Sequence, residues 1–96
     1  MTPAELKASL SAEAPPAGLD AALAVLWWAA KGDWHKAHSI AQEHEDEADG
    51  AWVHAHLHRI EGDLDNAGYW YRRAGRPRST APLPEEWNEI AAALLR

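Results

Sequence analysis

Residues Ala51–Ala74 read AWVHAHLHRIEGDLDNAGYWYRRA and carry the signals that decide the fold. Gly62 can adopt the left-handed conformation that ends a helix. The Asp63 side chain that follows it can accept hydrogen bonds from the first free amides of the next helix. The stretch therefore predicts two antiparallel helices joined by a tight Gly-Asp turn, an αα-hairpin.

The same Gly-Asp signal occurs earlier, at Gly32-Asp33. It separates a helix expected over Leu19–Lys31 from a helix expected over Trp34–Glu45. The first of these is apolar on nearly every side, so we expect it to be central in the fold or covered by another chain. The predicted hairpins then span residues 19–45 and 51–74.

Both ends of the chain contain helix signals. Thr2-Pro3-Ala4-Glu5 is a capping box with proline at the first helical position, which predicts a short helix over Pro3–Leu10. A last helix is expected from Pro84, and its apolar stripe consists of Trp87, Ile90, Ala91, Leu94 and Leu95. Linkers containing proline and glycine cover residues 11–18 and 75–83, and no segment alternates with a period of two. The sequence predicts one all-α domain, residues 1–96, in which helical hairpins stack between a short N-terminal helix and a C-terminal capping helix.

Composition narrows the class of protein. The chain has 96 residues, no cysteine and a net charge of −6, so thiolate metal sites are excluded and nonspecific nucleic-acid binding is disfavoured. The longest apolar run, Ala21–Ala30, is about half the length of a membrane span. The start of the chain lacks a basic segment followed by an apolar run, so we expect no signal peptide and a cytoplasmic protein.

The two turns introduce segments of similar pattern. The residues that carry the likeness are Gly62, Asp63, Ala67, Tyr71 and Ala74, with Gly32, Asp33, Ala37 and Ala41 at the equivalent places of the earlier hairpin. This pattern resembles the tetratricopeptide repeat, although the two turns are thirty residues apart and that repeat has about 34 residues. The resemblance implies hairpins stacked side by side, with protein or peptide binding as the usual role.

A stripe of His54, His58 and Glu61 follows one side of the helix before Gly62, because these residues have helical spacing. Two neutral imidazoles and a carboxylate are ligands for zinc or another divalent ion, and His38 or His35 of the preceding helix could complete the set. His56 points away from this stripe. The alternative is a structural hydrogen-bond network, in which the imidazoles bind helix carbonyls, tyrosine hydroxyls or Glu61.

A second group of side chains is expected to face outward as an interaction surface. It consists of Trp52, His56, Arg59, Tyr69 and Arg72. Aromatic and arginine side chains dominate interface energies, and the resemblance implies that the first three line a concave groove. An acidic peptide or another anionic group is the partner that these arginines favour. The alternative is a local contact in which Arg59 stacks on Trp52.

Three functions remain open. The leading prediction is a helical repeat-like interaction module, and no motif points to a catalytic nucleophile or a phosphate-binding loop. A divalent-metal-binding protein, or a metal-assisted enzyme that uses the stripe of His54, His58 and Glu61, is the second. The third is a structural subunit that dimerises through the helix over Leu19–Lys31, unless the N-terminal helix and the Trp87–Leu95 helix cap both ends of the hairpin stack internally.

Overall fold

The two Gly-Asp turns form as the sequence predicts. Gly32 and Gly62 adopt positive φ angles of +89° and +82°. The Asp33 carboxylate accepts from the amide of Lys36 at 3.1 Å, and the Asp63 carboxylate accepts from the amide of Asn66 at 3.2 Å. Each turn therefore ends one helix and caps the next.

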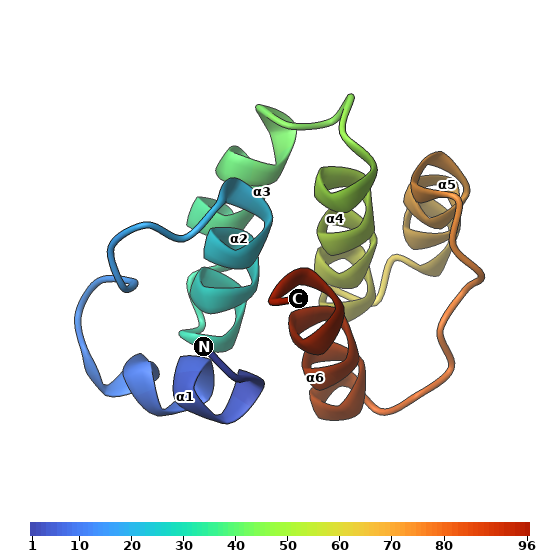
Figure 1. Cartoon of the computed structure of the whole chain (residues 1–96). Helices are drawn as coiled ribbons and strands as arrows, with labels where there is room; N and C mark the ends of the chain where they lie inside the picture. The colour runs from blue at the N-terminus through green and yellow to red at the C-terminus, as the bar shows by residue number, and fades with distance from the viewer.

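A computed structural model describes all residues, 1–96, and contains helices but no strand. The helices are α1 (Pro3–Ala8), the short 3-10 helix η1 (Ser9–Ser11), α2 (Ala21–Ala30), α3 (Trp34–Gln42), α4 (Ala48–Ile60), α5 (Leu64–Ala74) and α6 (Leu83–Leu94). The all-α prediction is confirmed, with hairpins α2–α3 and α4–α5, a short N-terminal helix and a C-terminal helix (Figure 1). The resemblance to the tetratricopeptide repeat stays a prediction.

The central helix is α4. It contacts α2, α3, α5 and α6, and Ala51 to His58 are all buried. The prediction expected the helix over Leu19–Lys31 to be central or covered by another chain. In the structure α2 is instead covered by its own chain, because α3, α4 and α6 pack against it. Self-association through α2 stays a prediction.

The observed ends of α2, α3 and α4 differ from the predicted ones by a few residues. The second helix begins at Ala21 rather than Leu19, because the Asp20 side chain caps it by accepting from the amide of Leu23 at 3.0 Å. Helix α3 ends at Gln42, and α4 already begins at Ala48. The connection between them therefore covers residues 43–47, three positions earlier than the expected 46–50.

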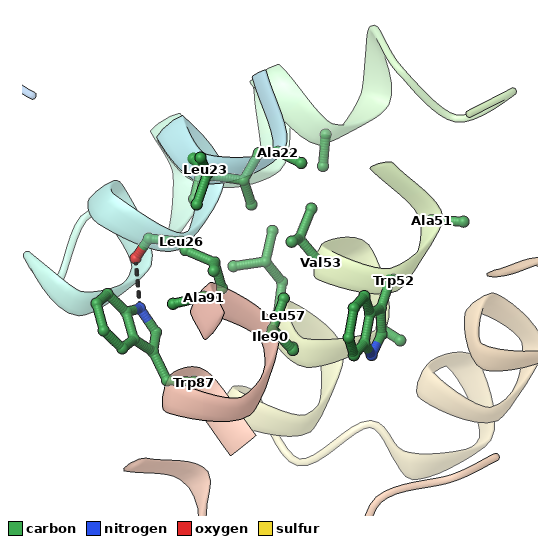
Figure 2. Packing of buried hydrophobic residues seen from close by; sticks show 14 of the residues in the cluster. Ala22, Leu23, Leu26, Ala51, Trp52, Val53, Leu57, Trp87, Ile90 and Ala91 are labelled. Carbon is green, nitrogen blue, oxygen red and sulfur yellow. Dashed lines mark hydrogen bonds between the residues drawn. The ribbon is translucent and has the colours of Figure 1, made fainter. Parts of the chain in front are cut away.

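The terminal helices close the core. Leu6 of α1 is fully buried, as are Ile90 and Ala91 of α6. The Trp87 indole of α6 donates from Nε1 to the Leu26 carbonyl of α2 at 2.8 Å (Figure 2). This bond and the surrounding apolar contacts hold α6 between the two hairpins. No helix of this fold combines the length and apolarity needed to cross a membrane.

Candidate functional site

Three histidines from two helices meet between the hairpins. His38 lies on α3, and His54 and His58 lie one turn apart on α4. One ring nitrogen of each lies within 4.8 Å of the other two. The closest pair is His38 Nε2 and His54 Nε2, at 3.1 Å. We call these three residues the histidine cluster.

Indole rings hold the cluster in place. The His54 ring stacks on Trp70 of α5 at 3.9 Å between centroids and on His58 at 4.9 Å. The His38 ring stacks on Trp34 at 4.6 Å, and Trp34 Nε1 donates to the Leu57 carbonyl at 2.7 Å. Since each imidazole has an aromatic neighbour, few ring rotations are open to the cluster.

Glu61 lies beside the cluster rather than within it. Its Oε1 lies 2.7 Å from His58 Nδ1, so the carboxylate accepts from that nitrogen and Nε2 is the free one. Glu61 groups with His58 and Asp63 in a second, more exposed set of ligand atoms. Of the four residues predicted as metal ligands, the structure therefore brings His38, His54 and His58 together and makes Glu61 a positioning group for His58.

Burial disfavours the charged form of His38 and of His54. Burial, reinforced by positive charge on His58 and His38, lowers the pKa of His54 to about 3. Burial and His58 also lower the pKa of His38. His54 Nδ1 is buried without a hydrogen-bond partner. These imidazoles therefore keep the unprotonated form, which is the form that binds metal ions.

A second polar cluster, the Glu86 network, joins α6 to the α4–α5 hairpin. Glu86 is 1% exposed and accepts hydrogen bonds from three side chains. His56 Nδ1 lies 2.6 Å and Arg59 NH1 2.8 Å from its Oε1, and the Tyr71 hydroxyl donates to Oε2. Burial opposes ionisation of Glu86, but the bonds from His56 and Tyr71 outweigh it and hold its pKa below the usual value. Glu86 is therefore a buried carboxylate with full hydrogen bonding.

The prediction that Trp52, His56 and Arg59 face outward is wrong. Trp52 and His56 are 9% and 2% exposed, and the Arg59 side chain is 13% exposed. For His56 and Arg59 the physical reason is α6, whose Glu86 binds both side chains. The local alternative also differs from the structure, because the guanidinium over the Trp52 ring belongs to Arg76, at 3.8 Å.

The other two residues of the predicted interaction surface, Tyr69 and Arg72, are exposed. Tyr69 is 43% exposed, and its hydroxyl accepts from Arg73 NH1 at 2.9 Å. Arg72 is exposed on the same helix. The structure thus separates the five predicted residues into three that are largely covered, Trp52, His56 and Arg59, and two that face solvent.

Sequence reasoning missed Glu86, which it treated only as part of a helix start. A signal was present, since Glu86 shares one face of its helix with Ile90, four residues later. A carboxylate on an apolar stripe indicates a buried partner for its charge. Stacking of Trp34 on His38 follows from helical spacing, because the two residues lie four positions apart on α3. Stacking of Trp70 on His54 had no comparable signal, because it depends on how α5 packs against α4.

None of the four cavities in the structure is lined by a residue of the histidine cluster. The cluster therefore has no adjoining cleft that would hold a larger substrate. Comparison with family models, with curated proteins and with solved structures found no match for this chain. The function is accordingly argued from the geometry.

Proposed function

We propose that this protein binds a divalent metal ion of the zinc class through His38, His54 and His58. The observation that carries the proposal is the 3.1 Å separation of His38 Nε2 and His54 Nε2. Two nitrogens bound to a tetrahedral zinc at roughly 2.0–2.1 Å lie about 3.3 Å apart. This pair needs almost no movement to bind the ion.

The third ligand is His58, through its Nε2. Its Nδ1 is already bonded to Glu61 at 2.7 Å, which is the arrangement in which a carboxylate orients a metal-binding imidazole. His58 Nε2 makes no hydrogen bond and is not fully buried, so it remains in contact with solvent. An ion can therefore enter from this side, and a water molecule can occupy a fourth position.

The ion would join α3 to α4 and thus connect the two helical hairpins. On this proposal the tetratricopeptide-like hairpins are fastened by the metal as well as by the core. A ligand that binds only the folded state stabilises it by mass action, so metal content and stability should rise together.

The test is metal analysis of protein purified without a histidine tag, followed by calorimetric titration of zinc into chelator-treated protein. We expect one ion per chain, and His38→Ala should weaken binding by about tenfold or more. The matched control is His44→Ala, because His44 lies outside the cluster and pairs with Glu47. Absence of zinc binding, or equal binding by the two variants, would overturn the proposal.

A peptide-binding role on α5 is the second candidate. It is favoured by the outer surface of that helix, where Leu64 and Tyr69 are 59% and 43% exposed beside Arg72. The double variant Tyr69→Ala and Arg72→Ala should retain the helical fold and lose a partner captured by the wild type. The control is Lys36→Ala, an exposed cation on α3. If the double variant and the control capture the same proteins, this role is excluded.

A further inference from the structure

The largest cavity of the fold, about 330 Å³, lies where α1, α2, α4 and α6 meet. Its apolar walls are formed by Leu10, Ala29, Ala30, Ile60, Leu83 and Trp87. Only two side chains with ionisable groups line it, Lys7 and His56, and neither is acidic. A volume of this size is at the lower end of the range for small-molecule sites.

His56 presents one particular nitrogen to this cavity. Its Nδ1 lies 2.6 Å from Glu86 Oε1, and because Glu86 is a carboxylate, Nδ1 must carry the hydrogen. His56 Nε2 makes no hydrogen bond within the protein, and it is not fully buried. Nε2 is therefore reached from the cavity that the ring lines.

Lys7 supplies a cation at the same cavity. The residue is exposed, forms no ion pair, and its Nζ lies 5.5 Å above the Trp87 ring. Glu86 does not pair with the Lys7 ammonium group, because its carboxylate is already bonded to Arg59, His56 and Tyr71. The charges of Glu86 and Arg59 compensate each other, so Lys7 is left without a counter-ion.

We propose that this cavity binds a small monocarboxylic acid with an apolar body. The carboxylate would bind together with one proton taken up from solvent, which would lie between one of its oxygens and His56 Nε2, and its other oxygen would face Lys7 Nζ. The apolar body would replace water against Leu10, Ile60 and Trp87. A neutral molecule of the same shape would gain the apolar contacts but no ion pair. The site is separate from the histidine cluster and does not depend on metal binding.

The test uses octanoate, which has about ten non-hydrogen atoms and suits a cavity of this size. Titration of octanoate into the full-length protein, followed by amide and indole chemical shifts, should give saturable changes confined to the cavity residues. Octanamide, its neutral counterpart, should bind at least about threefold more weakly. Equal binding of octanamide, or octanoate shifts located elsewhere on the protein, would overturn the proposal.

Two lysines that each lie over an indole ring provide a matched pair of variants. Lys7→Gln removes the cation at the cavity, whereas Lys36→Gln removes a cation 4.2 Å above Trp28, away from the cavity. Lys7→Gln should raise the Kd for octanoate by at least about threefold, and Lys36→Gln should leave it unchanged. Equal effects of the two changes would show that only overall charge matters and would overturn the proposal.

A variant that fills the cavity tests the location independently of charge. Ala30 is exposed at the end of α2, so Ala30→Phe can occupy the space without disturbing the core. It should abolish octanoate binding while circular dichroism shows an intact helical fold. His56→Gln should also abolish binding; if that variant does not fold, Ala30→Phe and Lys7→Gln decide. Octanoate binding to Ala30→Phe with wild-type affinity would contradict the proposal.

Discussion

Glu86 of α6 and His56 of α4 are joined by a hydrogen bond of 2.6 Å although both side chains are almost completely buried. The bond links the C-terminal helix to the surface of α4 that the sequence predicted as a groove for an acidic partner. That surface does receive an acidic side chain, and the side chain belongs to the same protein. Two polar clusters therefore flank α4, the histidine cluster on one side and the Glu86 network on the other.

Replacing the buried carboxylate should be costly. Glu86→Gln preserves the shape of the side chain but leaves Arg59 facing an amide that cannot balance its charge. We expect the free energy of unfolding to fall by about 3 kcal/mol, as for other buried ion pairs that lose one partner. Urea denaturation measures this change. The neighbouring variant Glu85→Gln, at an exposed position, should change stability by no more than about 0.5 kcal/mol, and similar values for both would contradict the burial argument.

Stability of the metal-free protein should decrease on acidification. The pKa of His54 is about 3 in the folded protein and returns toward the ordinary histidine value of 6.5 on unfolding. Between these values only the unfolded chain takes up the proton, so stability is lost as pH falls from 6.5 toward 3. One such histidine contributes up to about 1.4 kcal/mol per pH unit.

The measurement is urea denaturation with a chelator present, from neutral pH down to about pH 4. His54→Phe keeps an aromatic ring against Trp70 and removes the titrating group, so its stability should depend less steeply on pH. Identical slopes for wild type and variant would disprove the assignment to His54.

Zinc should raise the unfolding temperature of the chelator-treated protein. At a free zinc concentration about 100 times Kd, the expected stabilisation is about 2.7 kcal/mol. Glu61→Gln should weaken zinc binding roughly 10- to 100-fold, because a neutral amide replaces the carboxylate that accepts the hydrogen bond from His58 Nδ1. Asp65→Asn is the control, since this exposed carboxylate lies on α5 outside the cluster. Comparable zinc affinities in both variants would argue against the positioning role.

The glycine of each Gly-Asp turn is required for its backbone conformation and not for lack of space. Gly62 has φ of +82°, and a Cβ added there would meet no atom within 4 Å. Gly62→Ala should therefore cost about 1 kcal/mol through the left-handed backbone, without any steric clash. Gly32→Ala should cost a similar amount because that turn has the same geometry. Thermal unfolding compares the two, and unchanged stability in either variant would refute the explanation.

Two glycines inside helices should respond differently to alanine. A Cβ on Gly50 would lie 2.2 Å from the backbone oxygen of His44, which cannot easily move, so Gly50→Ala should cost about 1–3 kcal/mol. A Cβ on Gly68 would meet NH2 of Arg78 at 2.0 Å, the end of a flexible side chain that can swing away. Gly68→Ala should then be neutral or stabilising, because alanine favours helices. Denaturant midpoints of the two variants check the contrast, and the opposite order would be inconsistent with it.

The local structure of this chain could be predicted because its signals act over a few residues. Helix α5 spans Leu64–Ala74, the range that Asp63 as a cap and the following periodicity indicated. The pairing of His54 with His58 likewise follows from one helical turn. The sequence left open whether His38 or His35 joins this pair, because it does not show how α3 is rotated against α4.

By itself, then, the sequence determined the helices, the two turns and which side chains share one face of α4. The tertiary structure alone decided what covers each face. Helical periodicity places Trp52, His56 and Arg59 together, but it contains no information about the segments that cover them. Arg76 of the linker, residues 75–82, lies over Trp52, and Glu86 of α6 binds His56 and Arg59. Burial of Glu86 needs three donors from α4 and α5 at once, and such a set exists only when all three helices are in contact.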